Sequence, residues 1–374
     1  HAAHFDYQNA IKAIDGFSGD VKQFPALYEL RNSCVNAKEQ LVQWNDIASI
    51  PNFSFQLLIE NPTQAFADKT YGASYNRNFV TTDEFTAIIQ GLYDNGYILV
   101  SLSDIEAGTI FLPADKKPLV ITQTQVNYYT YMIDSDGDKL PDKDAAGFAS
   151  KLILDANGNI TCEMVDSTGQ TVTGSFDLVP ILDAFVETHP DFSYKGAKAV
   201  LALTGYDGLF GYRTNPQAQS FFGDDYYERA CKDAAEIANR LRSTGYELAC
   251  YTYGNVAYGA YSPEQIRADL TKWNMEVTPI LGDVSTFVFA QNSDILETTD
   301  AYSGEKYEEI RNFGFTRYLG FCTTGTPWFT PMDNQFRQGR IMVTGANLAN
   351  HQDWFSGFFD PIAILDPSRN TIPS

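Results

Sequence analysis

The fold is decided by residues 117–125, which read KPLVITQTQ. Residues 119–121 are apolar without alternation, which is typical of a strand buried on both faces of a parallel sheet. Polar residues follow at once, from Thr122 onward. In parallel α/β folds, functional side chains lie where the strands end. The stretch therefore predicts a buried strand whose carboxyl end carries candidate site residues.

Around this strand, predicted helices and strands alternate along the chain. A helix that Thr81 or Thr82 can cap runs to about residue 95, and a strand over 97–100 follows it. Further helices are predicted over 179–187, 226–243, 263–274 and 306–313, with strands over 199–204, 247–252, 286–290 and 318–322. Such alternation predicts an α/β fold with a mostly parallel sheet, either a barrel or a doubly wound sheet.

The 374 residues divide into two predicted parts. Residues 1–66 form a mainly helical N-terminal segment with an extended stretch at 53–59, and residues 67–374 form the α/β domain. Residues 151–176 differ from both, because turn sequences at 157–158 and 168–169 separate three strand-like runs. We expect this segment to be a small antiparallel β insertion.

Charge and hydropathy limit the partners of the chain. There are 47 Asp and Glu residues against 26 Lys and Arg, which gives a formal net charge of −21. Nucleic acids and anionic membranes attract basic patches, so neither is expected as a partner. The apolar runs are too short to span a bilayer. The acidity, together with a first residue that is His1 rather than Met, predicts a secreted or surface-attached protein whose signal segment has been removed.

Cysteines and aromatic residues say less about function. The five cysteines are scattered and odd in number, which predicts neither a disulfide framework nor a zinc-binding CxxC pair. Aromatic residues make up 14% of the chain. They suit an aromatic-rich core and equally a cleft that stacks on sugars.

Four predicted strand ends carry polar residues, at 122–129, 250–255, 290–294 and 322–329. Together they resemble the polysaccharide deacetylase family, the NodB-like carbohydrate esterases, over about residues 71–366. The segments that carry this resemblance are 80–104, 119–131, 177–214, 244–254 and 358–367. It implies a NodB-like distorted (β/α) barrel. Active members remove N- or O-acetyl groups from glycans with a divalent metal.

The catalytic motifs of that family are changed in this chain. The Thr-Phe-Asp-Asp motif supplies a general base and a metal ligand, and here Thr124 and Gln125 replace its two carboxylates. The two metal-binding histidines of the second motif correspond to Tyr251 and Asn255. For the last histidine motif the nearest candidate is His351.

The replaced residues cannot perform the family's chemistry. Acetyl removal by this route needs a Lewis-acidic ion that activates water and stabilises the oxyanion. Gln125, Tyr251 and Asn255 are neutral and poor ligands for zinc-like metals, and Thr124 is no general base near neutral pH. The sequence therefore predicts a catalytically degenerate deacetylase-like protein. We expect it to hold no zinc-like catalytic metal and not to act as an enzyme by this route.

Other polar and aromatic residues near the strand ends are candidates for carbohydrate binding in the former cleft. The predicted substrate-binding residues are Gln123, Gln125, Tyr128, Tyr206, Arg213, Tyr253, Gln291 and Trp328. Each also has a structural interpretation: Arg213 can pair with a nearby Asp, and Trp328 can anchor a loop.

Two other functions fit the same sequence. One is an active hydrolase that removes acetyl groups with a rearranged, metal-free site built on Asp207 or Asp353. The other is a structural or protein-interaction module in which rings fill the cleft. The position of the two carboxylates and the packing of the cleft discriminate between these functions.

An acidic stretch at 134–144 is a separate metal candidate. Its carboxylates lie at alternate positions, a spacing that can wrap oxygen ligands around Ca²⁺. The predicted ligands are Asp134, Asp136, Asp138, Asp142 and Asp144. The other interpretation is a solvated acidic turn.

Overall fold

A computed structural model describes residues 1–144 and 147–369. Within these residues, 7 parallel strands form a closed ring in the order β12-β11-β10-β9-β5-β2-β14, because β14 pairs with β12 again. The strands are β2 (Asn52–Phe55), β5 (Lys117–Thr124), β9 (Ala199–Leu203), β10 (Glu247–Cys250), β11 (Thr286–Val288), β12 (Arg317–Phe321) and β14 (Gln335–Met342). The ring confirms the expected distorted (β/α) barrel.

Alternate residues of each strand face opposite sides of the ring, as the pleat requires. Val120, Val200 and Ala202 belong to the apolar cluster inside the barrel. Leu119 and Ile121 belong to the larger cluster between the barrel and its helices. Both sides of β5 are therefore buried, which explains why its sequence is apolar without alternation.

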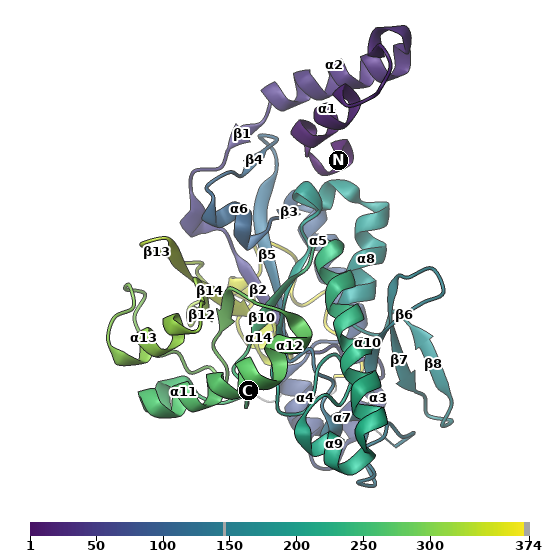
Figure 1. The fold of residues 1–374 in the computed structure, drawn as a ribbon, viewed down its shortest axis with the longest axis vertical. Helices are drawn as coiled ribbons and strands as arrows, with labels where there is room; N and C mark the ends of the chain where they lie inside the picture. The colour runs from purple at the N-terminus through teal and green to yellow at the C-terminus, as the bar shows by residue number, and fades with distance from the viewer. Residues whose placement is uncertain (145–146, 370–374) are drawn as a thin grey trace.

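Helices cover the outside of the ring (Figure 1). The longer ones are α5 (Thr82–Asp94), α8 (Leu178–Thr188), α10 (Asp224–Ser243), α11 (Pro263–Lys272) and α13 (Glu305–Asn312). Shorter helices are α3 (Pro62–Ala67), α4 (Gly72–Asn78), α6 (Leu102–Glu106), α7 (Thr130–Ile133), α9 (Pro216–Phe222), α12 (Thr278–Leu281) and α14 (Gly345–Asn350). The predicted cap of α5 is a capping box, in which Thr81 and Glu84 satisfy each other's backbone N–H groups.

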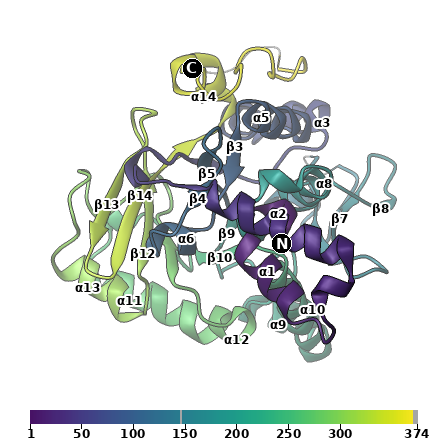
Figure 2. The same cartoon turned by 90° about the horizontal axis from the view of Figure 1, so that it is seen from above.

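The N-terminal segment is not separate from the barrel. Strand β2 pairs with β14 on one side and with β5 on the other, so the barrel begins well before the expected boundary at residue 67. The helices α1 (Tyr7–Asp15) and α2 (Pro25–Glu39) do lie apart, at the end of the molecule opposite α7 and α9 (Figures 1 and 2). A two-residue pairing of β1 (Val42–Gln43) with β4 (Phe111–Leu112) connects them to the barrel.

Three further strand groups complete the fold. The predicted insertion is a three-stranded antiparallel sheet of β6 (Lys151–Leu154), β7 (Ile160–Val165) and β8 (Thr171–Gly174). Strand β3 (Tyr97–Leu99) runs parallel to the start of β5. Strand β13 (Phe329–Met332) pairs antiparallel with β14. Neither β13 nor β14 was expected from the sequence, whereas β3 was.

Two global features bear on function. All five cysteines are free. None of the helices in the described part of the chain combines the length and the apolar character that crossing a membrane requires.

Candidate binding site at the carboxyl end of the barrel

The strands of the ring end on the side of the molecule that holds α7 and α9 (Figure 1). The positions that match the family's catalytic residues lie at this end. Thr124 and Tyr251 are buried, and Thr124 donates its hydroxyl to the carbonyl of Phe55 over 3.2 Å. Gln125 and Asn255 are partly exposed at the rim. The structure therefore places two of the four positions inside the protein and two at its surface.

The backbone at this rim is held in an unusual conformation. Gln125, Thr252, Asn255, Gln291 and Asn292 all have φ between 49° and 62°, in the left-handed region. Each follows β5, β10 or β11. This conformation costs a residue other than glycine about 1–3 kcal/mol, and it is rarest for a β-branched residue such as Thr252. Strain of this kind gathers at functional sites, which supports a site at this rim.

Two of these rim residues contact each other. The side-chain amide of Gln291 donates to the side-chain oxygen of Asn255 over 3.1 Å, and both residues are at least partly open to solvent. The sequence predicted that both lie at the strand ends. The pair presents neutral amide donors and acceptors, which can hydrogen-bond sugar hydroxyls but are poor metal ligands.

Inside the barrel, polar side chains form a hydrogen-bonded chain across three strands. Thr122 donates to Asn52 over 2.8 Å, and Asn52 donates to Gln338 over 3.1 Å. Gln338 in turn donates to the carbonyl of Ile50. Buried polar groups cost free energy unless they are paired. The chain satisfies these groups and links β5, β2 and β14.

Arg340 is the most unexpected residue of this interior. Its guanidinium is fully buried and donates to the hydroxyl of Ser54 over 3.0 Å and to the carbonyls of Phe289 and Gly320 over 2.8 and 3.2 Å. Burial lowers the pKa of Arg340 to about 10, although the phenol of Tyr251 and the carboxylate of Asp294 oppose this shift. In the described part of the chain, no carboxylate forms an ion pair with it.

These side chains do not fit a divalent ion. Uncharged hydroxyl and amide groups replace the three ligands, and the charge of Arg340 acts on Tyr251, one of the ligand positions. A second cation close to a buried guanidinium would be repelled strongly where water does not screen the charges. These residues therefore support no catalytic step through a metal.

Four predicted substrate-binding residues lie in the protein interior. Gln123 and Tyr128 are buried and donate to Asp177 over 2.8 and 2.6 Å. Arg213 donates to the carbonyls of Asp207 and Tyr128 over 2.8 and 2.6 Å. Tyr253 is buried as well, and its hydroxyl bonds Glu276. These contacts are structural, and the four side chains are almost completely buried.

Tyr206, another predicted residue, does reach the surface and belongs to a row of tyrosines. Its ring stacks on the buried Tyr129 with centroids 5.1 Å apart, and Tyr129 stacks on Tyr131 at 5.8 Å. Tyr131 contacts Tyr71 at 5.1 Å. Three of the four rings are between 36% and 43% exposed. Burial raises the pKa of Tyr131 to about 12, so its phenol is a neutral donor at pH 7.

Sequence reasoning missed Tyr71 and Tyr131. Tyr71 precedes α4 and Tyr131 lies in α7, so neither follows a barrel strand directly. A signal was present in the three tyrosines at 128, 129 and 131. An exposed row of rings beside the rim can stack on the apolar faces of sugars.

The two carboxylates of the metal-free alternative are not both placed for catalysis. Asp207 accepts from the backbone and the hydroxyl of Thr130 over 2.6 and 3.0 Å and lies 3.4 Å from Arg213. It therefore holds the loop after β9 in place. Asp353 is exposed on the surface, in a one-turn helix at 352–354.

The acidic loop at 134–144 forms a series of turns. Carboxylate oxygens of Asp134, Asp136 and Asp138 come within 4.8 Å of one another. In the described residues, this is the one group of three such side chains that could hold a metal. Asp142 accepts from Ser135, whereas Asp144 lies 3.3 Å from Lys143 at the surface. The structure thus brings three of the five predicted ligands together.

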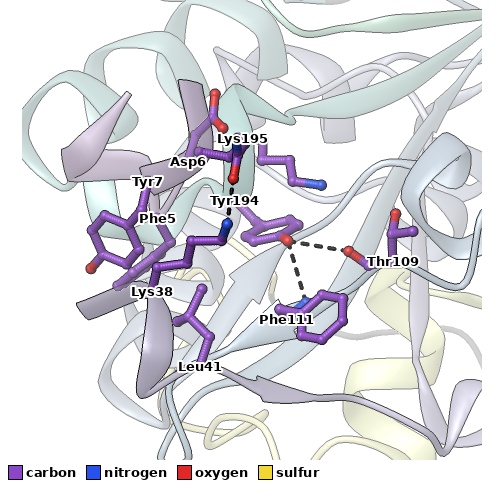
Figure 3. A pocket seen from close by; sticks show the side chains of 10 residues that line it. Phe5, Asp6, Tyr7, Lys38, Leu41, Thr109, Phe111, Tyr194 and Lys195 are labelled. Carbon is purple, nitrogen blue, oxygen red and sulfur yellow. Dashed lines mark hydrogen bonds between the residues drawn. The ribbon is translucent and has the colours of Figure 1, made fainter. Parts of the chain in front are cut away.

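A cavity of about 360 Å³ lies at the other end of the barrel, under α1 and α2 (Figure 3). In its wall, Tyr194 donates its hydroxyl to the carbonyl of Thr109 and accepts from the backbone N–H of Phe111. Lys38 bonds Gln8 across the two helices. Residues at the amino ends of barrel strands mainly serve stability. This cavity therefore marks where the N-terminal helices dock.

Comparisons with known proteins concern the fold. No protein-family model matches the sequence, and no curated protein matches it. Deacetylase PplD of Streptococcus pyogenes, solved with acetate, is similar at 11% identity and a TM-score of 0.42, over 80% of this chain and 93% of that one. A de-N-acetylase from Aggregatibacter actinomycetemcomitans is similar at 11% identity and a TM-score of 0.44, over 79% and 95%. The closed ring of parallel strands, with helices outside it, establishes a (β/α) barrel for this chain.

Proposed function

We propose that this chain is a catalytically degenerate deacetylase-like protein that binds carbohydrate at the carboxyl end of its barrel. One observation carries the first half of the proposal: the buried guanidinium of Arg340 lies at the barrel end where the resemblance would place a divalent ion. A fixed cation and neutral side chains replace a bound ion and its ligands.

The loss of chemistry follows from these replacements. Attack on an acetyl carbonyl needs a base to take the proton of water and a positive group to stabilise the oxyanion. Arg340 is positive, but its hydrogen bonds go to protein oxygens and it has no exposed surface. Thr124 is buried and cannot act as a base near neutral pH. Hydrolysis at the rate of an enzyme is therefore not expected.

The exposed rim supports carbohydrate binding. The tyrosine row of Tyr206, Tyr131 and Tyr71 offers ring faces, and the Gln291–Asn255 pair offers neutral amides. Rings that stack on sugar faces and amides that hydrogen-bond hydroxyls are complementary to a neutral glycan. Secretion or attachment to the cell surface belongs to this proposal, and fractionation of the cells that produce the protein tests it.

Activity and binding are tested separately. Acetylated chito- and xylo-oligosaccharides are incubated with the full chain after addition of Zn²⁺ or Co²⁺, and again with EDTA. We expect no acetate release above the background of heat-denatured protein. EDTA-sensitive release at enzymatic rates would overturn the degenerate assignment.

Binding is measured by calorimetry with neutral hexasaccharides of different linkage. Tyr206→Ala removes a ring whose loss should weaken binding about tenfold or more, since an aromatic contact contributes about 0.5–1.5 kcal/mol beyond its buried area. Tyr28→Ala is the matched control, because Tyr28 is similarly exposed but lies on α2 at the other end of the barrel. Equal affinity of both variants and the wild type would place carbohydrate elsewhere or exclude it.

One observation favours a protein-interaction module instead. Phe17, Phe24 and Tyr28 of the N-terminal segment are between 40% and 46% exposed, and the rings of Phe17 and Phe24 lie 5.1 Å apart. A contiguous apolar surface is typical of a protein contact. If every glycan fails to bind, crosslinking through α2 becomes the informative experiment.

A further inference from the structure

A second hollow opens beside the rim, between the loops that follow β11 and β12. This side cavity has a volume of about 770 Å³. Its wall includes Asn292, Asp294, Phe321, Thr323, Trp328 and Arg337. The side cavity begins at Asn292, which belongs to the rim at the strand ends. It lies on the outer side of β14. Gln338 and Arg340 point into the barrel, and Arg337 alternates with them, so its side chain points outward.

A buried ion pair lies in the wall of the side cavity. Asp294 accepts from Arg337 over 3.2 Å, from the hydroxyl of Tyr302 over 2.6 Å and from the backbone of Leu296 over 3.2 Å. The Arg337 side chain is 1% exposed, and its Nε has no hydrogen-bond partner among the residues that the structure describes. Buried donors are almost always paired, so an unpaired Nε in a cavity wall is a reason to expect a ligand or water there.

Aromatic rings fix this guanidinium. It lies 3.7 Å from the centroid of the Tyr302 ring and 5.2 Å from that of Trp328. Trp328 is held in turn by its indole N–H, which donates to the carbonyl of Phe321 over 3.1 Å. The pair is therefore preorganised rather than mobile, which lowers the entropy cost of binding a ligand.

Two glycines make room for this arrangement. Gly320 of β12 and Gly339 of β14 are directly paired in register. A Cβ atom at Gly320 would lie 2.5 Å from a carboxylate oxygen of Asp294, and one at Gly339 would lie 2.2 Å from the indole nitrogen of Trp328. Glycine inside a strand often marks such a close approach. The sheet is thus adapted to hold Asp294 and Trp328 where they are.

The charges of the wall select the ligand. Asp294 and Arg337 neutralise each other, and the exposed Glu297 at the opening of the cavity (its lip) adds a negative charge. An anion would meet net negative charge, and a cation would have to compete with Arg337. A carboxylate that accepts and a guanidinium that donates, side by side, are complementary to two adjacent hydroxyls. Thr323 and Thr324 add hydroxyls at the lip.

We propose that the side cavity binds a neutral polyol, a sugar residue with two adjacent hydroxyl groups, against the Asp294–Arg337 pair. The proposal shares the class of ligand with the proposed function but concerns a different place, and either can fail alone. One hydroxyl donates to Asp294 while its neighbour accepts from Arg337, and Trp328 forms the apolar part of the wall.

The test uses ligand-observed NMR titrations of the full chain. The probes are glucose, galactose and mannose, each a neutral hexose, and the matched glucuronic and galacturonic acids. We expect the wild type to bind at least one neutral hexose more tightly than its uronic acid. Asp294→Asn keeps the volume but leaves the charge of Arg337 uncompensated, so Kd for the neutral hexose rises at least about tenfold and uronic acid binding strengthens.

A second variant does not depend on the buried pair. Glu297→Lys changes an exposed charge at the lip and should strengthen uronic acid binding, whereas Glu187→Lys, an equal change at an exposed site on α8, should not. Failure of all three neutral hexoses to bind overturns the proposal. If Tyr206→Ala abolishes hexose binding and Asp294→Asn does not, the sugar binds at the rim: the side cavity is then excluded and the proposed function stands.

Discussion

The guanidinium of Arg340 donates to the hydroxyl of Ser54 over 3.0 Å inside the closed ring of strands. The bond links β14 to β2, and two more bonds link Arg340 to the loop after β11 and to β12. All three acceptors are neutral. A buried charge without a counter-charge is expensive, so it persists only where its hydrogen bonds are satisfied.

The geometry of the Arg340 guanidinium, a planar fork that reaches three acceptors, gives the first prediction. Arg340→Lys keeps the charge but cannot reach all three acceptors, and each acceptor left unpaired costs about 1–3 kcal/mol. Arg340→Met also leaves acceptors unpaired, but it removes a strongly desolvated charge. We expect both variants to lower the urea midpoint at pH 7, with Lys the more damaging. Arg311→Lys at the surface is the control, and a stable Arg340→Lys would show that the fork is not needed.

The missed strand shows what limits prediction from sequence. The barrel strands β5 and β9 are apolar and were predictable, because burial on both faces favours such runs. Strand β14 reads QFRQGRIM, and its arginines and glutamines are typical of a surface. Gln338 and Arg340 are buried because the closed ring supplies carbonyl, amide and hydroxyl partners from distant segments, which no local pattern reveals.

The same limit applies to the site. Thr124, Gln125, Tyr251 and Asn255 were located because they follow recognisable strands. Arg340 was not, since its strand was not recognised. Gln123 and Tyr128 were assigned to the substrate because sequence shows that a residue is near a strand end but not which way its side chain points. In the structure both contact Asp177, which comes from a segment more than 40 residues away.

Asp177 gives a prediction about pH. It accepts from Leu58, Gln123 and Tyr128, and its carboxyl is fully buried. Burial raises the pKa of Asp177 above its ordinary value, although these hydrogen bonds oppose the shift. The folded state therefore takes up a proton at higher pH than the unfolded state does. The contribution of Asp177 to the free energy of unfolding is fully present below the pKa of Asp in the unfolded chain, about 3.9. It is lost as the pH rises through the pKa of Asp177 in the folded state.

Asp177→Asn removes this titration. We expect the wild type to gain unfolding free energy relative to the variant as the pH falls toward about 4. Urea titrations at several pH values measure it. Asp166→Asn, at an exposed turn, should change the pH dependence in the opposite direction, because hydrogen bonds from the Thr168 hydroxyl and the Gln170 backbone lower the pKa of Asp166. A difference that is constant with pH would show that Asp177 does not titrate there.

Calcium binding by the acidic loop stays a prediction. Asp134, Asp136 and Asp138 gather their carboxylates, and oxygen ligands at this spacing suit Ca²⁺. We expect calorimetry to detect binding and Ca²⁺ to raise the thermal midpoint, with both effects lost in Asp136→Asn/Asp138→Asn. Mg²⁺ should act more weakly, because it demands octahedral geometry. The absence of both heat and thermal shift would leave the loop a solvated turn.

The ion pair between Glu84 and Arg369 gives the last prediction. Both side chains are almost completely buried, and the guanidinium makes two bonds of 2.6 and 2.7 Å to the carboxylate. Arg369 also bonds Asn76 and the carbonyl of Phe79, so it ties the C-terminal segment to α4 and α5. Removing one partner of a buried pair leaves the other charge uncompensated. Arg369→Ala should therefore cost about 3–5 kcal/mol in urea denaturation.

A double-mutant cycle separates the pair from the loss of packing. Glu84→Gln keeps an oxygen for the capping bond to the backbone of Thr81 but removes the charge. In that background Arg369→Ala no longer leaves a buried carboxylate unpaired, so it should cost less than in the wild type. The coupling free energy should lie at the upper end of about 0.5–3 kcal/mol. Additive effects would mean that Arg369 stabilises the protein through its contacts with Asn76 and Phe79, and not through the charge of Glu84.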